Sequence, residues 1–97
     1  MAIFVSLVNW TEQGIAGFKD TSKRVDAVEQ TLAKYGGRIK DMYWTIGPYD
    51  VVAVIEAPDD ESATAALLEI GSKGNVRTTT MRGFDRSEIQ AIISKTA

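Results

Sequence analysis

Four segments of the chain carry apolar runs, alternating patterns or β-branched residues, and these features predict four β-strands. Residues 2–9 are rich in β-branched and aromatic types, a composition that favours strands. Residues 38–46, 50–56 and 75–83 carry related patterns. The first strand is apolar on both faces, with Ile3, Val5 and Leu7 on one face and Phe4 and Val8 on the other.

Apolar residues at helical spacing predict three helices. The first begins after Thr21, a fair N-cap, and ends at residues 36–37, a pair of glycines. The second has Asp59 as its N-cap, and the third begins at Asp85, which pairs with Glu88 three residues later. Their apolar stripes are Val25, Val28, Leu32 and Tyr35 in the first, Ala63, Ala66, Leu67 and Ile70 in the second, and Ile89, Ile92 and Ile93 in the third.

Two further segments connect these elements. Residues 10–20 mix Gly14 and Gly17 with apolar residues, so we expect a packed connection here and not a regular helix. Residues 47–49 read Gly-Pro-Tyr, and Pro48 suits the second position of a tight turn, where its fixed φ is already correct. The strands on either side of this turn are therefore predicted to form a β-hairpin.

The resulting order is β-α-β-β-α-β followed by a C-terminal helix. Right-handed crossovers then give a four-stranded antiparallel sheet of order 4-1-3-2. We therefore expect an α+β, ferredoxin-like fold that forms one domain over residues 1–97. A chain of this length has room for one core and buries only about two-thirds of its unfolded surface. Burial of further surface against a second chain would therefore add to its stability. The apolar second face of the first strand also favours a homodimer.

Composition excludes several kinds of chemistry. The chain has no cysteine and no histidine, so disulfides, thiolate zinc sites, Ser-His-Asp triads and histidine-ligated haem are excluded. We expect no cofactor and no tightly bound transition metal; carboxylates could hold magnesium or calcium, but no known loop spacing supports this. The formal charge is −2 with no basic stripe, which argues against nucleic acid. No apolar run is long enough to span a membrane, and we expect a cytoplasmic protein.

The turn motif resembles a known family. Gly47, Tyr49 and Asp50 match the Gly-x-Tyr-Asp motif of the GYD-domain family, and the likeness extends over nearly the whole chain. Supporting matches are Val5-Ser6-Leu7-Val8-Asn9-Trp10-Thr11, Lys23-Arg24, Tyr43-Trp44-Thr45, Glu56-Ala57-Pro58-Asp59-Asp60 and Gly74-Asn75-Val76-Arg77-Thr78. The resemblance implies a dimeric α+β barrel, in which two sheets pack face to face, and a family without a settled biochemical role.

Four residues are the candidate ligand-binding site: Trp10, Tyr43, Tyr49 and Asp50. Tyr49 and Asp50 either stabilise the turn, as such residues commonly do, or mark the rim of a cavity. Trp10, Tyr43 and Trp44 are either core or interface residues, or they line an apolar pocket together with a few polar groups. In the second case Trp10 and one of Tyr43 and Trp44 contact the ligand, because adjacent strand residues face opposite ways. We expect such a pocket to lie beside the hairpin and not at the C-terminal helix.

Three functions are compatible with these residues. The first is a homodimeric binding or sensory module that holds a small apolar or aromatic molecule. The second is a cofactor-independent monooxygenase or isomerase acting on an aromatic or polyketide-like substrate, with Trp10, Tyr43, Asp50 and Arg82 polarising a phenol or enolate. The third is a purely structural dimer or a subunit of a higher-order assembly. The sequence alone does not choose among them.

Overall fold

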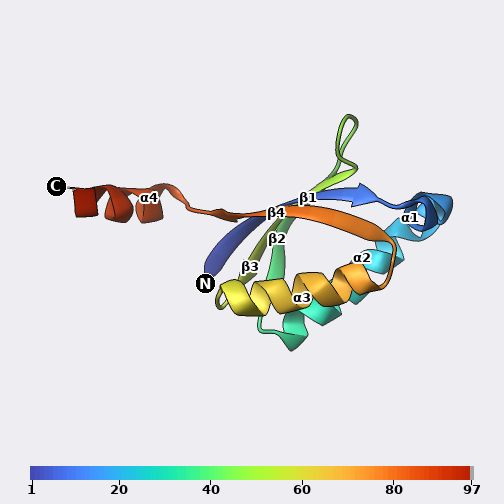
Figure 1. The fold of residues 1–97 in the computed structure, drawn as a ribbon, viewed down its shortest axis with the longest axis horizontal. Helices are drawn as coiled ribbons and strands as arrows, with labels where there is room; N and C mark the ends of the chain where they lie inside the picture. Colours follow the sequence, from blue (N-terminus) through green and yellow to red (C-terminus); the bar gives the residue numbers. More distant parts are fainter. Residues whose placement is uncertain (97) are drawn as a thin grey trace.

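The computed structural model describes residues 1–96 and contains one four-stranded sheet with helices (Figure 1). The strands are β1 (Ala2–Trp10), β2 (Arg38–Trp44), β3 (Val51–Ala57) and β4 (Val76–Gly83). The helices are α1 (Glu12–Ala16), α2 (Thr21–Lys34), α3 (Asp60–Ser72) and α4 (Arg86–Ile93), with 3₁₀ turns η1 (Phe18–Asp20) and η2 (Ser94–Thr96). The sheet order is β2-β3-β1-β4 and every pair is antiparallel. The predicted α+β fold and strand order are confirmed.

The core lies between the sheet and helices α2 and α3. Along β3 the side chains alternate, so that Val51, Ala53 and Ile55 are buried whereas Val52 and Val54 on the other face are only partly covered. Leu32 of α2 is 1% exposed and is the largest fully buried side chain. The period of two in the strands and the helical spacing in α2 therefore bury one common apolar layer.

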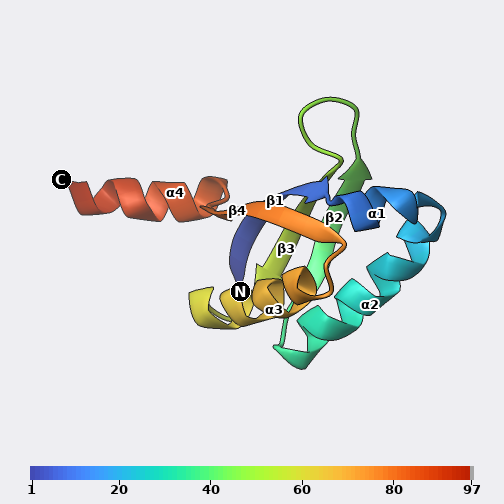
Figure 2. The ribbon, with the colours of Figure 1, turned by 45° about the vertical axis from the view of Figure 1, so that its right-hand side comes forward.

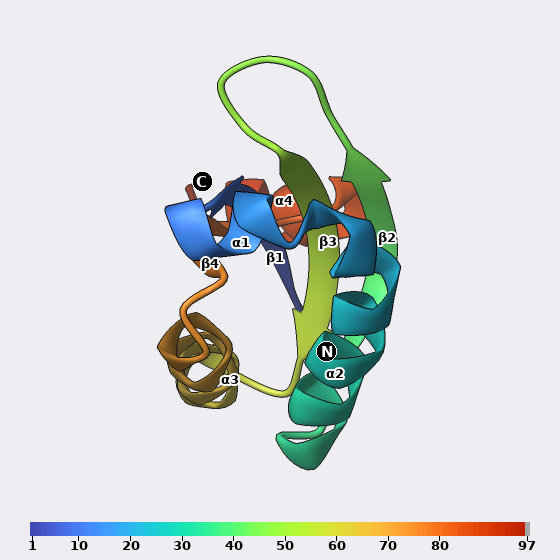
Figure 3. The same cartoon turned by 90° about the vertical axis from the view of Figure 1, so that its right-hand side faces the viewer.

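The opposite face of the sheet is apolar and no helix of residues 1–96 packs over it. Its side chains are half-buried or exposed and come from all four strands: Ile3, Val5, Leu7, Tyr43, Val52, Val54 and Met81. Figure 3 shows α2 in front of β2 and β3, whereas α4 lies behind these strands. Helix α4 continues from the end of β4 and projects away from the rest of the molecule (Figures 1 and 2).

Two of the three predicted helix caps are confirmed. The Asp59 carboxylate accepts the backbone N–H of Ser62 at 2.7 Å, and Asp85 forms a full capping box with Glu88. The prediction for Thr21 is wrong, because Thr21 is the first residue of α2 and Asp20 occupies the cap without a side-chain hydrogen bond. The 3₁₀ turn η1 runs directly into α2, which leaves no extended residue for a side-chain cap.

The expected irregular connection over residues 10–20 contains a short helix, which is a correction to the prediction. Thr11 caps α1 by accepting the N–H of Gly14 at 3.1 Å, and its hydroxyl donates to the Gly74 carbonyl oxygen at 2.5 Å. The backbone N–H of Thr11 also donates to the carbonyl oxygen of Asn75 at 3.1 Å. Contacts with the start of β4 therefore hold a five-residue helix that its central Gly14 alone would not favour.

We predict that the caps make the protein sensitive to acid. Backbone N–H donation from Ser62 lowers the pKa of Asp59 below its usual 3.8, and donation from Glu88 does the same for the pKa of Asp85. Because the folded pKa is the lower one, this stability is fully present above about pH 3.8 and is lost as the pH falls through the folded pKa.

The measurement is urea unfolding at pH 6 and pH 3. Asp59→Asn with Asp85→Asn keeps an oxygen acceptor at each cap but removes the proton equilibrium, so the double variant should lose less stability than the parent between these two pH values. An equal loss in both proteins would contradict the prediction.

Candidate functional site

Asp50 ties the β2–β3 hairpin to the end of β1. Its Oδ2 accepts the backbone N–H of Trp10 at 2.8 Å, and its own backbone N–H donates to the Val8 carbonyl oxygen at 2.9 Å. The predicted proximity of Trp10 to the hairpin is therefore confirmed. The carboxylate extends the β1–β3 ladder by one bond beyond the last strand pair, Val8 with Val51.

The hairpin loop is closed by its own hydrogen bonds. Thr45 donates its backbone N–H to the Asp50 carbonyl oxygen at 2.9 Å and its hydroxyl to the Tyr49 carbonyl oxygen at 2.6 Å. Gly47 has φ of +130°, a conformation that side chains rarely adopt. Figure 2 shows this loop rising as a projection from the sheet. Ile46 lies in it with its side chain fully in solvent, a feature that the sequence analysis did not single out.

The remaining candidate residues do not lie together on one face of the sheet. Tyr43 is 64% exposed and lies opposite Val52 on the uncovered face of the sheet. Trp10 lies on the helix side, where it borders a cavity, and the half-buried Tyr49 stays in the hairpin. The structure thus brings Trp10 and Asp50 together but places Tyr43 on the other face. Trp44, the neighbour of Tyr43, faces the helices and donates its indole N–H to the Thr21 hydroxyl at 3.0 Å.

An apolar cavity of about 80 Å³ lies between the sheet and the helices. Trp10, Leu32 and Met42 contribute to its walls, and the hydroxyls of Ser6 and Thr78 are its polar groups on the sheet side. Ser6 is buried and shares a 2.9 Å hydrogen bond with Thr80, which also donates to Thr78 at 3.3 Å. The hydroxyls therefore largely satisfy one another, and most of the remaining lining is apolar.

The two arginines near these sites have structural partners. Arg24 lines the cavity but donates to the carbonyl oxygens of Gly14 at 2.8 Å and Gly17 at 2.9 Å, so it fastens α1 to α2. Arg82 lies at the far end of β4 and pairs with Asp60 and Glu88. The constellation of Trp10, Tyr43, Asp50 and Arg82 is therefore not assembled. Within residues 1–96, no three carboxylates lie close enough together to hold a metal ion, and no helix is long and apolar enough to cross a membrane.

We predict that Asp50 acts mainly on stability. Asp50→Ala removes the acceptor of the part-buried Trp10 N–H and should cost about 1–3 kcal/mol in the free energy of unfolding. Asp50→Asn keeps an oxygen acceptor and should cost less than about 1 kcal/mol. Urea midpoints of the two variants and the parent provide the measurement. Normal stability of Asp50→Ala would show that the carboxylate does not hold the hairpin.

Comparison with known proteins identifies the family of this chain. The family model for the GYD domain matches residues 4–93, which includes the whole sheet from Phe4 onward. The chain belongs to the GYD-domain family. In this member the Tyr and Asp of the family motif lie at the closure of the hairpin, and the Asp joins the hairpin to the central strand β1.

A curated relative carries an informative name. The "Glutamine synthetase and cystathionine beta-lyase binding protein" of Thermus thermophilus is 32% identical over 92 residues, which cover 94% of this chain and 97% of the relative. A solved protein from Thermus thermophilus is 25% identical, with a TM-score of 0.55 and coverage of 88% and 95% of the two chains. A hypothetical protein from Pyrococcus horikoshii shares the fold at 19% identity, with a TM-score of 0.57 over 89% of this chain and 93% of its own.

Proposed function

We propose that this GYD-domain protein is a homodimeric protein-binding module whose β2–β3 hairpin contacts a metabolic enzyme. The hairpin carries the proposal, because it is a projection that hydrogen bonds close at its base, and its apolar side chain Ile46 lies fully in solvent. An exposed apolar side chain on a closed loop loses little conformational entropy on binding. The name of the Thermus thermophilus relative supports an enzyme as the partner and makes glutamine synthetase the first one to test.

The homodimer in this proposal uses the uncovered face of the sheet. Central strands β1 and β3 supply Val5, Leu7, Val52 and Val54 to this face, and all four are half-buried in the single chain. Contiguous apolar surface of this kind marks an interaction site. Two copies that pack these faces together would present two hairpins to the enzyme, and two linked contacts bind more tightly than either alone.

The experiment measures mass and then binding. Light scattering at micromolar concentration should give about twice the 10.6 kDa chain mass. Calorimetric titration into the glutamine synthetase of the organism that encodes this chain should show binding. Ile46→Ser should weaken this binding at least about 10-fold, the loss expected for one buried isoleucine. Leu68→Ser is the matched control, because Leu68 is an exposed aliphatic residue on α3, away from the hairpin. Absence of binding by the parent protein to both named enzymes would overturn the proposal.

A second candidate is the binding of a small apolar molecule in the cavity beside Trp10. The cavity favours it because its walls are mostly apolar and the hydroxyls of Ser6, Thr21 and Thr78 lie among them. Its volume of about 80 Å³ ranks it second, since pockets for drug-sized ligands occupy roughly 300–1,000 Å³. Mass spectrometry of small molecules released from the purified protein tests it. A reproducible stoichiometric compound would favour this function, and its loss in Val28→Trp, which fills the cavity, would assign the compound to this site.

A further inference from the structure

Helix α4 and Phe84, two residues before it, carry an apolar stripe that residues 1–96 leave in solvent. Ile89, Ile92 and Ile93 recur at the spacing that places side chains on one helix face, and they are 41%, 37% and 52% exposed. Phe84, just before the helix, is also half exposed. Helix α4 has 8 residues, whereas an isolated helix needs about 12–15 residues to be even marginally stable in water. It therefore requires a surface to pack on.

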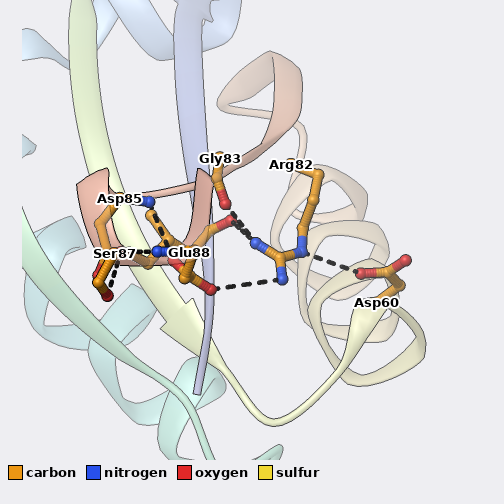
Figure 4. A network of polar contacts seen from close by, with 7 residues as sticks. Asp60, Arg82, Gly83, Asp85, Ser87 and Glu88 are labelled. Atoms are coloured by element: carbon orange, nitrogen blue, oxygen red, sulfur yellow. Dashed lines mark hydrogen bonds and ion pairs between the residues drawn. The ribbon is translucent and has the colours of Figure 1, made fainter. Parts of the chain in front are cut away.

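The direction of α4 is fixed at its base by Arg82 (Figure 4). The guanidinium lies 4.5 Å from the Phe84 ring and 3.9 Å from the Glu88 carboxylate, and it also pairs with Asp60 at 3.7 Å. Glu88 in turn accepts the Asp85 backbone N–H at 3.0 Å. These contacts join α3, β4 and α4, so the helix starts in a defined direction, away from the core of its own chain.

That direction leads past the uncovered face of the sheet. In Figure 3, α4 lies on the opposite side of β2 and β3 from α2, and in Figure 1 it extends well beyond the sheet. A second copy that packs on the uncovered face would occupy the space beside α4. The hairpin loop rises from a different part of the sheet (Figure 2), so an enzyme held by the hairpin would not cover this helix.

The size of the sheet gives an independent argument that α4 packs on a second copy of this chain. Four strands spaced about 4.8 Å apart, with 7–9 residues each at about 3.3 Å per residue, present roughly 500 Å² of sheet. A stable protein interface buries about 800 Å² on each partner. The sheet face alone therefore falls short, and the exposed apolar stripe of α4, which continues from the end of β4, would add to it.

We propose that α4 is an arm that packs its stripe of Phe84, Ile89, Ile92 and Ile93 on the second copy of this chain. This inference rests on the proposed homodimer. Each chain supplies one arm, and the twofold symmetry of a dimer places both arms in equivalent positions. Arg82 is then a positioning residue, because it sets the direction of the arm without touching the partner.

The first experiment observes the contact in the unaltered protein. Chains with ¹³C-labelled isoleucine methyl groups are mixed with unlabelled chains by unfolding and refolding, and only nuclear Overhauser effects between the two kinds of chain are recorded. The Ile3 methyl, on the uncovered sheet face, reports the dimer itself. The Ile15 methyl, exposed on α1, is the negative control. We expect intermolecular signals from Ile3, Ile89 and Ile92, and none from Ile15.

The second experiment measures the contribution of the arm. Ile89→Ser with Ile92→Ser should raise the dimer dissociation constant at least about 100-fold in sedimentation equilibrium, because two chains each lose two apolar contacts. Gln90→Ser, at a polar position of the same helix that is not part of the stripe, should leave the constant unchanged. A charge variant, Arg82→Gln, should weaken the dimer while leaving the stripe intact.

The outcomes separate the arm from the dimer. If Ile3 gives intermolecular signals but α4 gives none, and the serine variant dimerises like the parent, the dimer stands and the arm is refuted. If the parent is a monomer without Ile3 signals, both proposals fail. If the serine variant loses enzyme binding and not dimerisation, the stripe binds the enzyme and the arm is likewise refuted.

Discussion

Leu7→Asp is expected to convert the proposed homodimer into a monomer, with a dissociation constant raised more than about 1,000-fold. Leu7 lies in the central strand β1 on the uncovered face, between Val52 of β3 and Thr79 of β4. The change removes about 1.5–3 kcal/mol of apolar burial from each chain and would place a carboxylate in an apolar interface. Symmetry doubles both effects. Sedimentation equilibrium over a range of protein concentrations measures the constant.

Leu68→Asp is the matched control for this change. Leu68 is 71% exposed on α3, so the same substitution adds the same charge on the helix side of the molecule. Leu68→Asp should leave the dissociation constant of the dimer unchanged. A dimer that survives Leu7→Asp but dissociates with Leu68→Asp would place the interface on the helices and would contradict the proposed use of the sheet face.

The topology could be predicted from the sequence because each element carries its own local signal. The buried strand β3 alternates without interruption, Asp59 and Asp85 stand at helix starts, and the turn at Gly47 requires the conformation that glycine provides. Helix α1 had only one such signal, its N-cap Thr11, and Gly14 opposes a helix at this position. Hydrogen bonds to the start of β4, more than 60 residues away in the chain, stabilise it, and such bonds leave no local pattern.

The candidate site could be predicted only in part because of one bulge in β2. The register with β3 shifts between Ile39 and Asp41, so Ile39 and Met42 both face the helices although strict alternation would place them on opposite faces. The same shift fixes Tyr43 on the uncovered face. The contact of Asp50 with β1, in contrast, followed from the strand order, which the sequence pattern predicted correctly.

The position of α4 was also beyond the sequence pattern. Its capping pair and apolar spacing predict an amphipathic helix, and such a helix would ordinarily pack on the core of its own chain. The contacts of Arg82 with Asp60 and Glu88 direct it elsewhere. Nothing in the spacing of these three residues along the chain indicates that they meet. Polar contacts that the local sequence pattern does not reveal therefore set the position of α4.

Leu32→Ala is expected to give the largest loss of stability among the core variants. Leu32 is 1% exposed and lines the cavity beside Val28 and Ile39, so its loss enlarges an existing space that the surrounding backbone cannot readily fill. Such changes cost about 2–5 kcal/mol. For a domain of this size, each kcal/mol shifts the melting temperature by about 4–8 °C, so a fall of roughly 10–30 °C should appear in calorimetry.

The control and a rescue experiment show what this cavity can hold. Leu68→Ala, at an exposed position of α3, should change stability by less than about 0.5 kcal/mol. Benzene should raise the melting temperature of Leu32→Ala, because an enlarged dry cavity binds small apolar molecules and binding to the folded state stabilises it. If benzene stabilises the parent equally, the natural cavity is already open to small molecules, and the second candidate function gains support over the protein-binding one. If it stabilises only the variant, the natural cavity is ordinary core space, and the function of the protein lies on its surface.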